Sequence, residues 1–337
     1  TSAIFLAIKS LDIPPGSLIL TNAFTFVAVP SAILQAGCIP LLCEVNENLR
    51  LDEENLNTLL QDHPVAAILV SNIRGHVSNM DHIIDKADRY RIPVIEDAAH
   101  CYGASWDGKP IGTIGDVGCF SFQSYKMIRC GEGGALVTRN PKVAARATIM
   151  SGAYEANWRH HLAPQKLCQS LQGTVPSYNC RLSELCSARA LTEIQAADAR
   201  INKFRQNYSS ALSLLESING VAIPQQYEKE FRAPDSIQFL LHECPDDDIR
   251  MAVNQLRARG LEIECFGANR NNARCFWNWR FLAKIPSLPK TRSYLRKLVE
   301  IRFNDEDTED DIIQATKEIK KEICYNITKY NTRLKPG

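Results

Sequence analysis

The first 150 residues alternate six short apolar runs with segments of helical pattern, and this alternation constrains the fold most strongly. Each apolar run is bounded by Gly, Pro, Asn or Asp, which is typical of buried strands. Near-continuous apolar strands separated by helices indicate a mostly parallel sheet with helices on both faces, an α/β fold. The predicted strands are residues 17–21, 38–43, 66–71, 93–96, 117–122 and 135–138, and the predicted helices are residues 25–36, 52–61, 79–90 and 141–151.

A second, smaller unit follows this region. Residues 181–215 have the pattern of one long helix or a broken pair, and beyond them the strand rhythm is lost. We therefore predict a large domain that carries the site, a smaller C-terminal α+β domain and a tail. Their predicted bounds are residues 1–205, 206–330 and 331–337, and the small domain is expected to hold a strand at 237–241, a helix at 246–259, a strand at 261–265 and a last helix at 308–323.

The composition argues against several classes of function. The chain has 39 basic and 38 acidic residues, so its net charge of +1 creates no global field that would attract nucleic acid or a membrane surface. No apolar run approaches the roughly 20 residues that span a bilayer. The 12 cysteines include no C-x-x-C pair, so we expect reduced thiols, no metal site and a cytoplasmic location.

Two charged residues lie just past the ends of predicted strands. Asp97 follows the strand at 93–96, and in open α/β sheets ligands bind at the carboxyl ends of strands; the alternative is a helix N-cap. Lys126 follows the strand at 117–122, and burial there would lower the pKa of its amine and allow it to form a Schiff base. The alternative for Lys126 is a solvated surface lysine.

Hydroxyl groups and glycines surround this lysine. Phosphate dianions are bound by hydroxyls and by unhindered backbone N–H groups, and we interpret Ser121 as a phosphate ligand. The glycines at 131, 133 and 134 suit a hairpin turn equally well, and we interpret them mainly as a turn. A lysine, a strand-end carboxylate and a phosphate site are what pyridoxal 5′-phosphate requires, so the sequence predicts this cofactor.

The same segments resemble a known family. Residues 95–104 read IEDAAHCYGA, residues 115–126 run from Gly-Asp through Phe-Ser-Phe to lysine, residues 131–134 read GEGG, and residues 178–185 read YNCRLSEL. In this order they resemble the DegT/DnrJ/StrS sugar-aminotransferase family of fold-type I pyridoxal-phosphate enzymes. The resemblance implies an aminotransferase that moves an amino group from glutamate or glutamine to a keto-sugar, keto-cyclitol or related ketone.

The resemblance also implies roles around the cofactor ring. Lys126 would form the Schiff base and then move a proton, and Asp97 would pair with the pyridine nitrogen. His100 occupies a position that contacts the ring oxygen in the family. Phe26 would lie against the ring face, where an aromatic side chain gains from stacking, although packing in the core is an alternative.

Further positions are implied to bind the cofactor phosphate. Ser121 would do so, together with Thr1 and Ser2 at the start of the first helix, where the helix dipole favours an anion. Asn179 would reach the phosphate of a neighbouring subunit, so we expect a homodimer with the site at the subunit interface. The alternative for Asn179 is a turn residue.

Two departures from the family pattern leave alternatives open. Family members carry a segment before the point where this chain begins, and a second polypeptide is one possible source of it. Residues 269–280, rich in Arg, Asn and Trp, replace an H-Y-x-P-like segment and suit a substrate-facing loop or a domain contact. Elimination or cyclisation chemistry on the same fold, or a non-catalytic homologue acting as a partner subunit, are the alternative functions. The retained Lys126 argues against a dehydratase, in which histidine replaces it.

Overall fold

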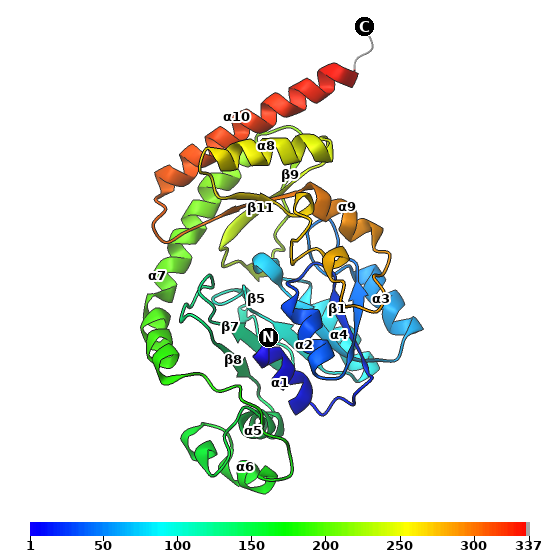
Figure 1. The fold of residues 1–337 in the computed structure, drawn as a ribbon, viewed down its shortest axis with the longest axis vertical. Helices are drawn as coiled ribbons and strands as arrows, with labels where there is room; N and C mark the ends of the chain where they lie inside the picture. The colour runs from blue at the N-terminus through cyan, green and yellow to red at the C-terminus, as the bar shows by residue number, and fades with distance from the viewer. Residues whose placement is uncertain (335–337) are drawn as a thin grey trace.

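A six-stranded sheet forms the centre of the computed structural model, which describes the backbone of residues 1–334 and the side chains of residues 1–325 (Figure 1). The strand order is β2-β1-β3-β4-β7-β8; the first five strands are parallel, and β8 is antiparallel to β7. Every strand coincides with a predicted run, so the α/β prediction is confirmed. The strands are β1 (Leu18–Asn22), β2 (Ile39–Cys43), β3 (Val65–Ser71), β4 (Val94–Asp97), β7 (Val117–Ser121) and β8 (Gly134–Val137).

Helices cover both faces of this sheet, which explains why its strands are apolar throughout. Along β3, Ala67 and Leu69 pack into one apolar cluster, while Ile68 and Val70 point to the opposite face and join another. Both faces are therefore removed from water, and neither can carry polar side chains at alternate positions. The first cluster contains α1 (Ser2–Ser10), α2 (Ala28–Gln35) and α5 (Pro141–Met150), and the second contains α3 (Glu53–Asp62) and α4 (Met80–Tyr90).

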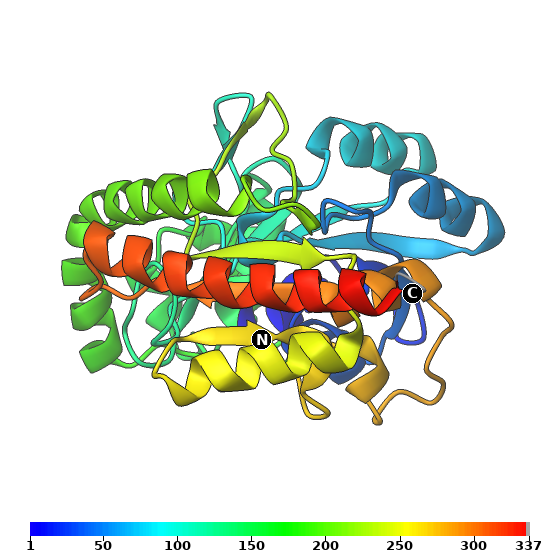
Figure 2. The same cartoon turned by 90° about the horizontal axis from the view of Figure 1, so that it is seen from above.

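The C-terminal part builds a four-stranded antiparallel sheet in the order β12-β13-β11-β9. Two helices, α8 and α10, lie side by side over it (Figures 1 and 2). The last helix extends beyond the predicted end at residue 323 and includes residues 331–334 of the predicted tail; residues 335–337 lie outside the described part. The elements are β9 (Val221–Ala222), β11 (Ser236–Leu241), α8 (Asp246–Ala258), β12 (Ile263–Cys265), β13 (Leu298–Arg302) and α10 (Glu309–Leu334).

A single 32-residue helix, α7 (Glu184–Leu215), connects the two sheets and runs along one side of the molecule (Figure 1). It spans the predicted domain boundary at residue 205, which stays a prediction. Midway along it, Arg200 donates from Nη1 to Met127 O at 2.6 Å and from Nε to Asp305 Oδ1 at 3.1 Å. The helix therefore ties the loop after β7 to the segment that precedes α10.

Smaller elements complete the fold. A three-stranded sheet pairs β10 with β5 and β5 with β6. Among the described helices, none is long and apolar enough to cross a membrane. The remaining elements are β5 (Ser105–Trp106), β6 (Lys109–Pro110), β10 (Glu230–Phe231), α6 (Gln165–Leu171), α9 (Pro289–Lys297) and the 3-10 helices η1 (Ile73–Gly75), η2 (Asn157–His160), η3 (Phe266–Ala268) and η4 (Phe276–Asn278).

Glu96, next to Asp97 on β4, holds the loop that leads into β7. Its buried carboxylate accepts hydrogen bonds from the backbone N–H groups of Gly112 (2.7 Å), Ile114 (2.7 Å) and Gly115 (2.6 Å). Burial raises the pKa of Glu96, and these donors oppose that rise. The glutamate of the IEDAAH segment is thus structural, a role that the sequence did not reveal.

We expect Glu96→Ala to lower the free energy of unfolding by about 3 kcal/mol, because it leaves three buried N–H groups without an acceptor. Urea denaturation followed by circular dichroism measures this change. The exposed Asp62, at the end of α3, provides a control, and Asp62→Ala should shift the free energy by no more than about 0.5 kcal/mol. Equal effects of the two substitutions would contradict the role of Glu96.

Candidate active site

Asp97 ends β4 at the carboxyl edge of the parallel strands, between β3 and β7. Its Oδ2 accepts a hydrogen bond of 2.7 Å from Ser71 Oγ, and Ser71 Oγ accepts one of 2.7 Å from Thr25 Oγ1. Its Oδ1 accepts from the N–H of Ala99 at 3.2 Å. Residues 98–100 form a turn, so the helix N-cap interpretation of Asp97 is wrong. Sequence reasoning missed Ser71 and Thr25, which fix this carboxylate in place.

Lys126 lies in the loop that joins β7 to β8. The loop is a hairpin in which the N–H of Phe122 donates to Gly133 O and the N–H of Cys130 donates to Phe122 O, both at 2.9 Å. Gly131 has a φ of +89°, which favours glycine. The glycines thus serve the turn, as we interpreted them. Burial lowers the pKa of Lys126 to about 8 and outweighs the nearby carboxylates of Asp235 and Asp97. The half-buried side chain points inward and its Nζ contacts His100 Nε2, so the solvated-lysine interpretation is wrong.

His100 links the lysine to a carboxylate from the C-terminal part of the chain. Lys126 Nζ lies 2.6 Å from His100 Nε2, and His100 Nδ1 lies 3.0 Å from Asp235 Oδ2. Burial, together with the charge of Lys126, lowers the pKa of His100 well below its usual value. Burial alone would raise the pKa of Asp235, but the charges of Arg74 and His100 hold it well below its usual range. A neutral imidazole therefore donates from Nδ1 to Asp235 and accepts at Nε2 from Lys126.

We expect the rate of cofactor capture to rise with pH up to about 8 and then level off. Only the unprotonated amine attacks an aldehyde, and the Lys126 amine loses its proton with a pKa of about 8 rather than 10.5. Stopped-flow absorbance after adding pyridoxal phosphate to cofactor-free protein would follow this rate. A rate that still climbs steeply near pH 10 would show that Lys126 titrates as an ordinary lysine.

The predicted phosphate-binding positions lie near the ends of β7 and α1. Ser121 is the last residue of β7, and its Oγ accepts from the N–H of Gln123 at 3.4 Å. Ser2 begins α1, and α1 packs against β4 and β7. The phosphate-binding roles of Ser121, Ser2 and Thr1 stay predictions.

Phe26 and Asn179 both have exposed side chains. Phe26 lies between β1 and α2 and is 44% exposed, which excludes the core-packing interpretation. Asn179 lies in the loop before α7, between residues whose N–H groups bond to Met150 O and Ser151 O. The loop geometry is compatible with a turn role, and the contact of Asn179 with a neighbouring subunit stays a prediction.

The segment at residues 269–280 packs the C-terminal part against the loop after β1. Trp279 is buried, Cys275 forms a β-bridge with Phe24, and the N–H of Val27 donates to Ala273 O at 3.0 Å. The guanidinium of Arg274 lies 5.9 Å from the Phe26 ring centre. The segment is therefore a domain contact, and one of its side chains lies beside a predicted cofactor residue.

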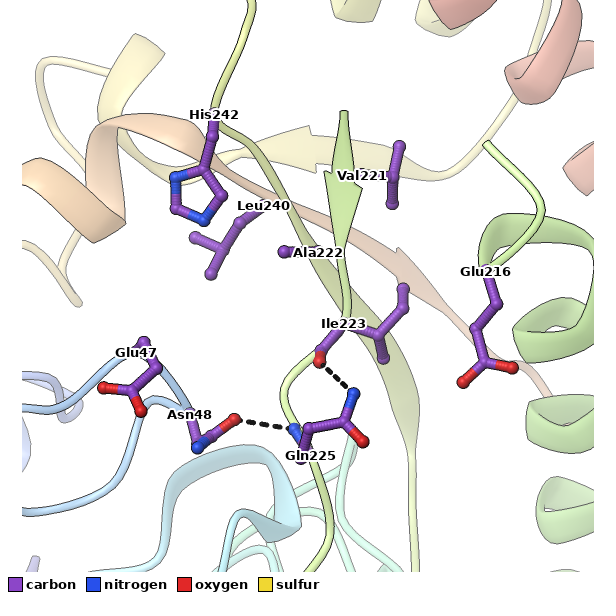
Figure 3. A pocket seen from close by; sticks show the side chains of 9 residues that line it. All are labelled: Glu47, Asn48, Glu216, Val221, Ala222, Ile223, Gln225, Leu240 and His242. Atoms are coloured by element: carbon purple, nitrogen blue, oxygen red, sulfur yellow. Dashed lines mark hydrogen bonds between the residues drawn. The ribbon is translucent and has the colours of Figure 1, made fainter. Parts of the chain in front are cut away.

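A separate hollow of about 520 Å³ lies between the loop after β2 and the small sheet (Figure 3). In Figure 3 a dashed line marks the hydrogen bond that the N–H of Gln225 donates to Asn48 Oδ1 at 2.7 Å, which joins the loop after β2 to the segment after β9. None of the predicted site residues lines it, and its two carboxylates do not suit an anionic cofactor. The lining residues are Glu47, Asn48, Glu216, Val221, Ala222, Ile223, Gln225, Leu240 and His242.

Comparisons of sequence identify relatives of this chain. Residues 1–320 match the DegT/DnrJ/EryC1/StrS aminotransferase family. The chain is 31% identical over 277 residues to a putative L-glutamine:3-amino-2,3-dideoxy-scyllo-inosose aminotransferase of Micromonospora echinospora, covering 78% of this chain and 62% of that protein. It is 29% identical over 237 residues to the putative pyridoxal phosphate-dependent aminotransferase EpsN of Bacillus subtilis, covering 67% and 58%. It thus spans less than two thirds of the length of these relatives.

Solved structures agree with the fold. The aminotransferase TlmJ from Streptoalloteichus hindustanus superposes with a TM-score of 0.83 at 18% identity, covering 96% of this chain and 84% of that one. At this identity the likeness concerns the fold alone. The match over residues 1–320 confirms the resemblance seen in the sequence: the chain belongs to the DegT/DnrJ/EryC1/StrS aminotransferase family of pyridoxal-phosphate-dependent enzymes.

Proposed function

We propose that the protein is an aminotransferase that moves an amino group from glutamate or glutamine to a keto-sugar, keto-cyclitol or related ketone. The observation that carries this proposal is Lys126, whose lowered pKa and bond to His100 leave its amine ready to act beside the strand end that bears Asp97. The names of the two relatives, one acting on a scyllo-inosose derivative, support the acceptor class.

The residues of the site fit pyridoxal phosphate. The Lys126 amine, with its lowered pKa, suits the cofactor aldehyde. The fixed carboxylate of Asp97 suits the ring nitrogen, and the half-exposed ring of Phe26 suits the ring face. The residues that would hold the cofactor are Lys126, Asp97, Phe26, His100, Ser121, Ser2 and Thr1, with Asn179 from a neighbouring subunit.

Each of these side chains has a task that follows from its surroundings. The cofactor supplies an electron sink for the pair released when the substrate Cα–H bond breaks. Lys126 Nζ takes that proton and returns it, which a pKa of about 8 suits. Asp97 holds a proton on the ring nitrogen. Neutral His100, oriented by Asp235, holds the Lys126 amine in position.

Two alternative functions receive less support. A dehydratase of this fold would lack the lysine, which is present here. A non-catalytic partner subunit would not need a partly buried chain of hydrogen bonds that ends on the Lys126 amine.

We also propose a homodimer whose interface includes the surroundings of Asn179. Leu162, Leu185 and Leu191 are exposed, and two of them lie on the first half of α7, directly after the Asn179 loop. Leucines that are exposed to this extent would be buried by a partner. Sedimentation equilibrium is expected to give twice the monomer mass. No disulfide links any two cysteines of the described residues, which supports the cytoplasmic location that we propose.

The half-reaction with an amino donor tests the proposed function. Adding glutamate or glutamine to the cofactor-loaded protein should remove the visible absorbance band, and a keto-cyclitol or keto-sugar acceptor should restore it. Mass spectrometry of the products would identify the acceptor. A loaded protein whose spectrum ignores every amino donor would instead support the non-catalytic alternative.

A further inference from the structure

Three arginines from distant parts of the chain surround the lysine end of the site. Arg74 follows β3, Arg302 ends β13, and Arg274 lies in the segment at 269–280. The charges of Arg74 and Arg302 act on the pKa of Lys126, and the same two charges act on the pKa of Arg274. Four cationic groups therefore share one region.

The carboxylates of this region already accept hydrogen bonds, one of them from Arg74. Asp235 accepts from His100, at 3.0 Å, and from Ser236 Oγ, at 2.7 Å. Glu264 Oε1 accepts from Asn272 Nδ2 at 2.9 Å. Glu300 accepts from Arg74 Nη2 at 2.7 Å and from Gln238 Nε2 at 3.0 Å.

The arginines consequently keep unused hydrogen-bonding capacity. Arg74 is 1% exposed, and its Nη1 lies 3.6 Å from Asp235 Oδ2, beyond hydrogen-bonding distance. Within the described part of the chain, neither Nη1 nor Nε has a hydrogen-bond partner. Arg302 lies 3.9 Å from Asp235 and donates one long bond, 3.4 Å, to Tyr125 O. Arg274 lies 3.7 Å from Glu264, beyond hydrogen-bonding distance. Buried guanidinium N–H groups without an acceptor are costly, and an anionic ligand would satisfy them.

Two exposed aromatic rings lie beside the guanidinium groups of Arg274 and Arg302. The guanidinium of Arg274 is 5.9 Å from the Phe26 ring centre, and that of Arg302 is 5.8 Å from the Tyr125 ring centre. Phe26 and Tyr125 are 44% and 67% exposed, and Tyr125 directly precedes Lys126. The side chains of Arg274 and Arg302 are 20% and 27% exposed, so a ligand can reach them.

We propose that Arg274 and Arg302, backed by Arg74, bind a carboxylate of the amino donor. This inference rests on the proposed function and adds the residues that would recognise the donor. Guanidinium groups match the planar carboxylate through paired hydrogen bonds. An amino-acid donor carries a carboxylate next to the carbon that must face Lys126, whereas a keto-cyclitol acceptor is uncharged. The phosphates of a nucleotide-linked acceptor are the other possible source of an anion.

Calorimetric titration of the cofactor-loaded protein with glutarate, a dicarboxylate without an amine, tests the site without turnover. Arg302→Met and Arg274→Met are each expected to raise the glutarate Kd about 10- to 100-fold. Arg302→Lys keeps the positive charge but loses the paired N–H donors of the guanidinium, so it should give a smaller increase in the glutarate Kd. Arg270→Met, in the same segment and exposed, should leave the Kd within about twofold of wild type.

A parallel titration with uridine diphosphate distinguishes the two sources of the anion. Its affinity should change little in the Met variants; if uridine diphosphate loses affinity and glutarate does not, the donor assignment is overturned. A wild-type protein that does not bind glutarate, or Met variants that bind it unchanged, would overturn the site. The glutamate half-reaction is measured separately, so failure of this inference and failure of the proposed function remain distinguishable.

Discussion

Replacing Lys126 with alanine is expected to abolish covalent retention of the cofactor after borohydride reduction. The Lys126 amine is the group whose pKa burial lowers to about 8, and it lies 2.6 Å from the neutral imidazole of His100. Without this amine the chain has no nucleophile for the covalent link and no group to carry the proton, so turnover should fall by about four orders of magnitude or more. Mass spectrometry of the reduced protein measures the link.

A matched lysine makes this result specific. Lys109, on β6, is exposed and lies before β7, so Lys109→Ala should retain the covalent label at wild-type stoichiometry. Thermal denaturation of both variants would show that each is folded. Equal labelling of the two variants, or label that maps to another lysine in the Lys126→Ala protein, would contradict the assignment.

Asp97→Asn is expected to lower turnover by about 10²- to 10⁴-fold while the cofactor still binds. The amide has the shape of the carboxylate and can keep the 2.7 Å hydrogen bond from Ser71, so the strand end should not move. It cannot, however, hold a proton on the ring nitrogen through a negative charge. Steady-state kinetics and cofactor stoichiometry measure the two effects separately.

Ser71→Ala is the companion measurement for Asp97. It removes one donor to the carboxylate but leaves the charge, so its effect on turnover should be about tenfold. If Asp97→Asn turned over substrate nearly as fast as wild type, the carboxylate would not act on the cofactor. If Ser71→Ala were as damaging as Asp97→Asn, the position of the carboxylate rather than its charge would dominate.

The sequence predicted the central sheet because its strands are buried on both faces. A strand such as β3 must then be apolar at successive positions, which distinguishes it from its helical neighbours. The same property indicated Asp97 and Lys126, since a charged residue close to the end of such a strand is unusual. The alternation of apolar strands and helices therefore predicted both the sheet and the edge of the sheet at which the candidate site lies.

Strand β13 escaped prediction because charged residues interrupt its apolar pattern. Glu300 is buried there only because Arg74, 226 positions away, pairs with it at 2.7 Å. The bond between Asp235 and His100 spans 135 positions in the same way. Such pairs depend on the fold that brings the strands together, and no local periodicity reveals them. The two-residue strands β5, β6, β9 and β10 are too short to show any period.

The unbroken helix α7 limits how parts of this protein can be recombined. Arg200 bonds at once to Met127 O, next to Lys126, and to Asp305, just before α10. Further along, Ser210 Oγ donates to Glu309 Oε1 at 2.6 Å. A chimera that grafts the C-terminal part of another relative onto this chain would lose these acceptors unless the graft carries carboxylates at both positions. Exchange of the C-terminal part alone would therefore disturb the loop that carries Lys126, although that loop is distant in sequence.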